Sequence, residues 1–119
     1  LMRRLIKDAL KSDHRIEVVG SAADGEEALN KIPLLRPDLI TLDVQMPGLD
    51  GLATLPFLSK RHPNLRVIML SSLTAKGTAE TIDALANGAD DHVAKPSQSS
   101  NVIASVQYLT QELLPRIHT

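Results

Sequence analysis

Apolar positions along the chain alternate between two spacings, which predict helices and strands in turn. Steps of three and four residues between apolar positions at the start of the chain predict a first helix over residues 1–10. The same spacing predicts further helices over four stretches: 24–32, 51–62, 78–87 and 102–113. Short runs of apolar and β-branched residues predict four strands: 16–19, 38–43, 66–70 and 91–94. Alternating helices and strands with short links predict an α/β fold, in which a parallel sheet is covered by helices on both faces.

Two prolines fall inside predicted helices and qualify this pattern. Pro33 lies late in one helix and Pro56 lies inside another. Proline has no backbone N–H and its ring clashes with the preceding turn, so we expect each helix to be shortened or kinked.

Composition narrows the class of protein without naming a function. The 119 residues suit one domain with a single aliphatic core. No apolar run approaches the ~18 residues of a membrane span, and the absence of cysteine agrees with a reducing cytosol. A net charge of -1 and only two aromatic residues offer nucleic acid neither attraction nor a stacking surface. We therefore expect a cytoplasmic domain that binds neither membranes nor nucleic acid.

Chemically active side chains follow three of the predicted strands. Asp43 ends the strand at 38–43, Ser71 and Ser72 follow the strand at 66–70, and Lys95 follows the strand at 91–94. In doubly wound sheets, ligands bind beyond the carboxyl ends of the strands. A carboxylate nucleophile, a hydroxyl and a cation at one rim suit phosphoryl transfer. Each residue alone is more often a cap or a turn residue, so the prediction depends on the combination.

The order and spacing of these residues resemble those of a known family. The sequence Asp43-Val44-Gln45-Met46-Pro47-Gly48-Leu49-Asp50-Gly51, followed by Ser71-Ser72 and Lys95-Pro96, resembles the phosphoacceptor site of two-component receiver domains. The resemblance covers the whole chain. It implies a flavodoxin-like doubly wound parallel sheet of strand order 2-1-3-4-5. It also implies that Asp43 accepts a phosphoryl group from a histidine kinase.

The same resemblance implies a role for each site residue. Asp43 and the backbone carbonyl of Gln45 would bind Mg²⁺, and Lys95 would pair with the phosphoryl oxygens. Ser71 would turn its hydroxyl toward the phosphoryl group. Ser72 and Val44 would line the phosphoryl-binding site.

Two further expectations concern the last strand. His92 stands where the family usually has Phe or Tyr, an aromatic that moves inward as the hydroxyl turns, so His92 is a candidate switch residue. A histidine there would add sensitivity to pH near neutrality, although a space-filling role is an equal alternative. The family also implies a cis peptide bond before Pro96, which is uncommon even for proline.

A narrower resemblance involves two segments, 69–77 and 84–91. Both are similar to the receiver of the chemotaxis protein-glutamate methylesterase. In that subfamily the receiver restrains a C-terminal esterase domain until it is phosphorylated. We expect that output domain to be absent from residues 1–119.

The start of the chain departs from the family pattern. Receivers open with a strand that ends in two acidic residues, whereas Leu1 already matches the first helix. We therefore expect residues 1–119 to be a receiver domain truncated at its N-terminus, without the first strand. Mg²⁺ would then bind weakly or not at all. The strand at 16–19 would lose its partner, which predicts instability of the monomer, dimerisation or strand exchange.

The sequence thus predicts a phosphorylation switch that acts on an output domain or partner protein, and not an enzyme that turns over a substrate. The alternative is a degenerate receiver that only presents an interaction surface and is independent of phosphorylation. The missing acidic pair favours this alternative, whereas the set Asp43, Ser71 and Lys95 favours the active switch. An α/β-hydrolase lacks support because the chain has no nucleophile elbow.

Overall fold

The computed structural model describes residues 2–44, 48, 50–72, 75–97 and 101–119. The chain forms two compact units. One is Gly20–Lys95, and the other combines Leu1–Val19 with Pro96–Thr119. Among the described residues, no helix is both long enough and apolar enough to cross a membrane.

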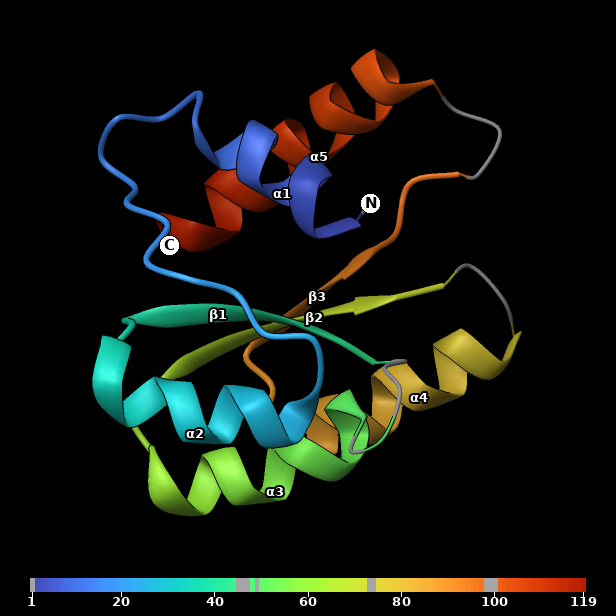
Figure 1. Cartoon of the computed structure of the whole chain (residues 1–119). Helices are drawn as coiled ribbons and strands as arrows, with labels where there is room; N and C mark the ends of the chain where they lie inside the picture. Colours follow the sequence, from blue (N-terminus) through green and yellow to red (C-terminus); the bar gives the residue numbers. More distant parts are fainter. Residues whose placement is uncertain (1, 45–47, 49, 73–74, 98–100) are drawn as a thin grey trace. The chain divides into compact units, whose positions relative to one another are not determined.

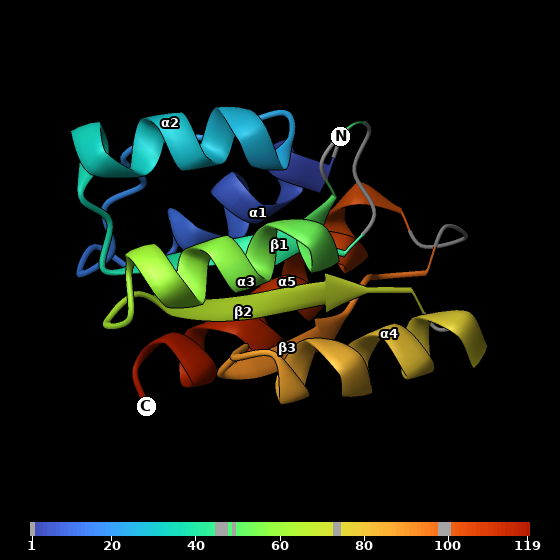
Figure 2. The same ribbon diagram turned by 90° about the horizontal axis from the view of Figure 1, so that it is seen from below.

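The unit Gly20–Lys95 is built on a parallel sheet of three strands. These are β1 (Leu39–Asp43), β2 (Arg66–Ser71) and β3 (Asp91–Ala94), in that spatial order. Three helices lie on one face of this sheet (Figure 1): α2 (Gly25–Leu35), α3 (Gly51–Arg61) and α4 (Ala75–Ala86). Figure 2 shows them side by side across that face, with α3 between the other two. Because the strands are parallel, their carboxyl ends meet at one edge of the sheet.

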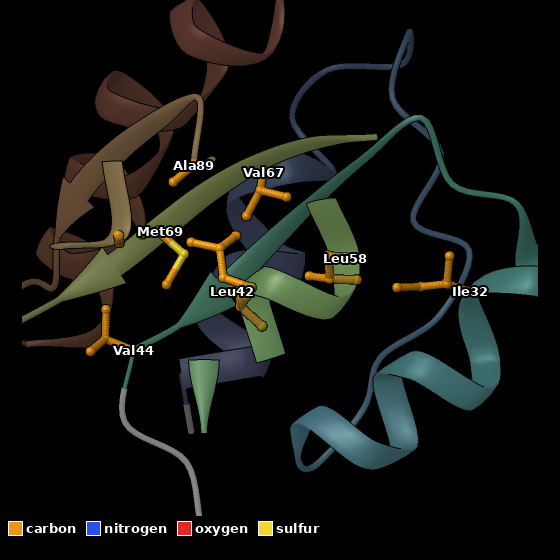
Figure 3. Packing of buried hydrophobic residues seen from close by; sticks show 9 residues of the cluster. Ile32, Leu42, Val44, Leu58, Val67, Met69 and Ala89 are labelled. Carbon is orange, nitrogen blue, oxygen red and sulfur yellow. The ribbon is translucent and has the colours of Figure 1, made fainter. Parts of the chain in front are cut away.

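The core of this unit fills the space between the sheet and its helices (Figure 3). Leu42 of β1 pairs in register with Met69 of β2, and Leu58 of α3 belongs to the same buried cluster. Full burial of one leucine side chain contributes about 1.5–3 kcal/mol. The cluster thus fixes α3 against the strands whose ends carry the site. Its buried members are Ile32, Leu42, Val44, Leu55, Leu58, Val67, Met69, Ala84 and Ala89.

Aspartates set the start of two of these helices. The side chain of Asp24 accepts a hydrogen bond from the backbone N–H of Glu27, and Asp50 does the same for Ala53. Such an N-cap contributes about 1 kcal/mol to helix stability. Asp50 belongs to the phosphoacceptor motif, and its role in the structure is to begin α3. α2 continues past Pro33 and α3 continues past Pro56, so neither proline ends its helix, and a kink at either position stays a prediction.

The second unit consists chiefly of α1 (Met2–Leu10) and α5 (Val102–Ile117), which pack against each other. The buried face of α5 contains Ser105, Leu109 and Leu113. The predicted apolar stripe is therefore confirmed at Leu109 and Leu113 but not at Val102, which is 56% exposed.

Asp13 links the segment after α1 to the C-terminal end of α5. Its carboxylate accepts hydrogen bonds from the backbone and the guanidinium of Arg15 at 2.9–3.0 Å, and lies 2.6 Å from Nε2 of His118. Hydrogen bonds from Arg15, followed by the one to His118, hold the pKa of the Asp13 carboxyl well below its usual range. The charged form of Asp13 is thus the one that the fold favours.

The predicted strand at 16–19 is wrong, because these residues form no strand. A strand requires a neighbour whose backbone groups pair with its own. In the part of the chain that the structure describes, β1 pairs with β2, and no strand pairs with residues 16–19. Val18 and Val19 are each about two-fifths exposed, so their apolar pattern does not mark a buried strand. The five-strand order 2-1-3-4-5 and helices on the second face of the sheet stay predictions.

Candidate functional site

Asp43 and Lys95 form an ion pair at the carboxyl edge of the sheet. Asp43 is the last residue of β1, and Lys95 directly follows β3. Nζ of Lys95 lies 2.8 Å from Oδ1 of Asp43, and about a quarter of each side chain is exposed. The backbone N–H of Lys95 donates to the carbonyl of Ser71 at 2.7 Å, which ties the lysine to the end of β2. The sequence prediction that a carboxylate and an ammonium group meet at this edge is confirmed.

Ser71 ends β2, between the strands that carry the ion pair. It stands one residue beyond Leu70, the register partner of Asp43. The side chain is buried, and its Oγ is hydrogen-bonded to Oγ1 of Thr81 on α4 at 2.8 Å. Sequence reasoning missed Thr81. The only available signal was a polar residue among the apolar positions of a predicted helix.

Glycines let two helices begin close to the strand ends. A Cβ on Gly51 would lie 2.1 Å from the carbonyl oxygen of Asp43. A Cβ on Gly77 would lie 2.2 Å from the carbonyl oxygen of Ser72. Both distances are far below van der Waals contact, so a side chain larger than hydrogen would displace the backbone that carries the site.

The structure also describes two further residues of the predicted site, Val44 and His92. The backbone N–H of Val44 donates to the carbonyl of Leu70 at 2.9 Å. This hydrogen bond extends the pairing of β1 with β2 by one residue, and the phosphoryl-binding role of Val44 stays a prediction. The side chain of His92 is 46% exposed, with Nδ1 3.9 Å from a carboxylate oxygen of Asp91. The side chain of His92 is therefore partly exposed, and its role as a switch residue stays a prediction. The predicted carbonyl ligand Gln45 lies outside the described residues.

The predicted cis peptide bond before Pro96 is wrong. The described residues contain no cis peptide bond, and the bond between Lys95 and Pro96 is trans. The trans form is the one that local energetics favour, by about 0.5–1 kcal/mol before proline.

The described residues do not by themselves complete a magnesium site. Mg²⁺ prefers near-octahedral oxygen ligation and usually one or two carboxylates with several waters. Within the described part of the chain, no three carboxylate, imidazole or thiol side chains gather closely enough to hold a metal ion. Asp43 is already paired with Lys95, so the carboxylate present does not fit a strong site on its own.

Comparison with known proteins identifies the family of this chain. The sequence profile of the response regulator receiver domain matches residues 1–107. This chain belongs to the response regulator receiver domain family. Relatives that it matches include protein-glutamate methylesterases, the subfamily that the sequence indicated. A protein-glutamate methylesterase/protein-glutamine glutaminase of Trichodesmium erythraeum is 43% identical over 117 residues, or 98% of this chain and 33% of that protein. The corresponding protein of Pyrococcus horikoshii is 43% identical over 116 residues, again 98% of this chain and 31% of that protein.

Solved structures agree with these relatives. The response regulator domain of Thermotoga maritima CheB is 44% identical, with a TM-score of 0.84 over 98% of this chain and 85% of that chain. A chain of the CheX–CheY–BeF₃–Mg²⁺ complex from Borrelia burgdorferi is 29% identical, with a TM-score of 0.71 over 92% of this chain and 79% of that chain. The chain is therefore the receiver domain of a two-component response regulator, homologous to CheB receivers. It spans about a third of the length of the curated relatives that it matches.

Proposed function

We propose that Asp43 is the phosphoacceptor of this receiver, and that Lys95 and Ser71 hold the phosphoryl group once it is attached. The observation that carries the proposal is the 2.8 Å pair between Asp43 and Lys95 at the edge where the three strands end. A carboxylate next to a fixed ammonium group is oriented before its substrate arrives. The cation is then in place to neutralise charge on the phosphoryl oxygens.

The donor would be a phosphohistidine of a histidine kinase. A carboxylate oxygen of Asp43 forms a bond to phosphorus while the bond between phosphorus and the imidazole nitrogen breaks. The bonding pair stays on the imidazole, which takes a proton from solvent, and the product is an acyl phosphate on Asp43. Such transfer depends mainly on in-line positioning and on electrostatic stabilisation. Lys95 supplies the electrostatic stabilisation, because its backbone N–H is hydrogen-bonded to β2 and its ammonium group lies next to the carboxylate of Asp43.

Receiver domains generally bind Mg²⁺ in the phosphorylation site. When bound, the ion shields the negative charges of the carboxylate and the incoming phosphoryl group from each other. In this chain the proposed ligands are Asp43 and the carbonyl of Gln45. Because no three carboxylate, imidazole or thiol side chains gather into a metal site among the described residues, we expect weak Mg²⁺ binding.

The added phosphoryl group would switch the surface of the receiver. It brings negative charge and hydrogen-bond acceptors to the edge of the sheet. The Ser71 hydroxyl and the Ser72 segment are the groups next to α4 that can respond. His92 is exposed on β3 and would take part only if its ring moved inward.

The output would be a partner domain and not catalysis of substrate turnover by the receiver. The relatives that carry this domain are named methylesterases and glutaminases and are about three times as long as the matched segment. We infer that phosphorylation of this receiver controls such a C-terminal esterase in the cytoplasm. A receiver that acts only as an interaction module, without phosphorylation, is the second candidate, favoured by the lack of a cluster of three possible metal ligands among the described residues.

Phosphotransfer to matched variants tests the proposal. The natural polypeptide that carries this sequence is incubated with acetyl phosphate and Mg²⁺, or with a phosphorylated histidine kinase, and its intact mass is measured. Asp43→Asn should abolish the phosphorylated species, and Lys95→Ala should reduce it strongly. Asp38→Asn is the control, because Asp38 is exposed and directly precedes the first residue of β1, at the end of the strand away from Asp43. This variant should leave the yield unchanged. If no form is modified, the interaction module becomes the better account.

A further inference from the structure

A buried threonine on α4 contacts the hydroxyl that the proposed switch uses. Oγ1 of Thr81 lies 2.8 Å from Oγ of Ser71, and both residues are buried, with 8% and 5% of their surface exposed. Both lie in the unit Gly20–Lys95, so this contact belongs to one compact body. Thr81 therefore connects α4 to the end of β2 at the proposed site.

The number of hydroxyl protons decides the direction of this hydrogen bond. Oγ1 of Thr81 also lies 2.9 Å from the carbonyl oxygen of Gly77, one helical turn earlier. A hydroxyl has a single proton to donate and lone pairs with which to accept. Helical threonines commonly donate to the carbonyl four residues before them. When Thr81 donates to Gly77, Ser71 must be the donor in the bond between the two hydroxyls.

We propose that Thr81 is a positioning residue that holds the hydroxyl of Ser71 against α4 before phosphorylation. The inference rests on the proposed function, in which Ser71 hydrogen-bonds the phosphoryl group on Asp43. Ser71 has one proton, so it cannot donate to Thr81 and to a phosphoryl oxygen together. Thr81 thereby sets how readily the receiver adopts the phosphoryl-binding arrangement.

Oγ1 of Thr81 and a phosphoryl oxygen compete for the hydroxyl proton of Ser71. A hydrogen bond to a charged phosphoryl oxygen is stronger than one between two neutral hydroxyls. In the phosphorylated protein, Ser71 therefore donates to the phosphoryl oxygen and no longer to Thr81. The bond to Thr81 must break first, and it opposes the switch by its own free energy. Removing the acceptor should therefore favour the phosphoryl-binding arrangement. Its loss should also release α4 from the end of β2, since this bond joins them directly.

Beryllofluoride with Mg²⁺ is the probe, because it mimics the phosphoryl group and binds reversibly. The half-saturating concentration is measured for the natural polypeptide that carries this sequence and for Thr81→Val, which keeps the shape and removes the hydroxyl. A typical net hydrogen bond corresponds to about a fivefold change in an equilibrium constant. We expect Thr81→Val to bind beryllofluoride about fivefold more tightly, and Thr81→Ser to bind like the parent protein.

A second background separates positioning from a merely structural role. In Ser71→Ala there is no hydroxyl to hold, so adding Thr81→Val should leave the half-saturating concentration unchanged. The inference is overturned if Thr81→Val shifts the half-saturating concentration equally in the parent protein and in Ser71→Ala. It is also overturned if Thr81→Val in the parent protein leaves beryllofluoride binding unchanged or weakens it. Urea unfolding of each variant verifies that it folds, and Thr81→Ala replaces Thr81→Val if the valine is not accommodated.

The same data distinguish this inference from the proposed function. If Asp43→Asn binds beryllofluoride as tightly as the parent, or the parent does not bind it, the proposed function fails and the role of Thr81 fails with it. If binding requires Asp43 and yet ignores the Thr81 hydroxyl, the phosphoacceptor stands and only the positioning role is refuted.

Discussion

Replacing Gly51 by alanine tests how closely α3 must approach the residue proposed to be phosphorylated. A Cβ at this position would lie 2.1 Å from the carbonyl oxygen of Asp43 and 2.8 Å from its carbonyl carbon. It would also lie 3.1 Å from Cα of Val44. All three are backbone atoms, so no side-chain rotation relieves the overlap. Either the start of α3 or the end of β1 has to move.

The expected loss of stability follows from two opposing effects. Overpacking in a close-packed region costs about 1–3 kcal/mol, and contacts with rigid backbone justify the upper end of this range. Alanine is favoured over glycine inside a helix by up to about 1 kcal/mol. Because Gly51 is the first residue of α3, it receives at most that gain. We expect a net decrease in the free energy of unfolding of about 2 kcal/mol.

Urea unfolding measured by circular dichroism gives this quantity. With a slope of about 2 kcal/mol per molar, the midpoint should fall by about 1 M while the slope stays constant. Gly20→Ala is the matched control. There the added Cβ meets only the tip of the flexible Leu35 side chain, at 2.6 Å, so the change should stay below about 1 kcal/mol. Equal midpoints for Gly51→Ala and Gly20→Ala would refute the claim that α3 requires a glycine next to Asp43.

Two further predictions concern the two compact units. Asp13 has a depressed pKa in the folded state, so its hydrogen bonds stabilise the fold at pH values above the ordinary aspartate pKa. That contribution is lost as the pH falls below this value toward the depressed pKa, so the unfolding midpoints of the parent and Asp13→Asn should differ at pH 7 and converge in acid. A constant difference at all pH values would contradict the role of the charged carboxylate. Met69 is fully buried under α3 and α4, so Met69→Ala should lose about 2–5 kcal/mol in the same urea assay. The exposed Ile82 provides the control, and a similar loss in Ile82→Ala would show that the measured cost does not come from core packing.

Three of the four predicted strands form the sheet, each with bounds within one residue of the prediction. The strand at 91–94 was predicted with the bounds that β3 has, because Gly88 and Lys95-Pro96 delimit it. α4 begins at Ala75, three residues earlier than predicted, and includes Gly77, which packs closely on the backbone of Ser72. Residues 16–19 have the composition of a strand but no pairing partner among the described residues.

The sequence predicted the part of the candidate site that consists of charged residues at the ends of strands. Asp43 and Lys95 follow strands, and the geometry of a parallel sheet brings such ends together. The contact between Thr81 and Ser71 was not predictable, because it depends on the exact packing of a helix on a strand ten residues away. The backbone hydrogen bond from Val44 to Leu70 was likewise not predictable, because it depends on how far the pairing of β1 with β2 continues beyond Asp43.

The most direct test of the central claim is to locate the phosphoryl group on the chain. The natural polypeptide is phosphorylated with acetyl phosphate and reduced with borohydride, which converts an aspartyl phosphate to homoserine, and the peptides are mapped by mass spectrometry. The account predicts homoserine at position 43 and none in Asp43→Asn. Modification at another carboxylate, or modification that persists in Asp43→Asn, would contradict it.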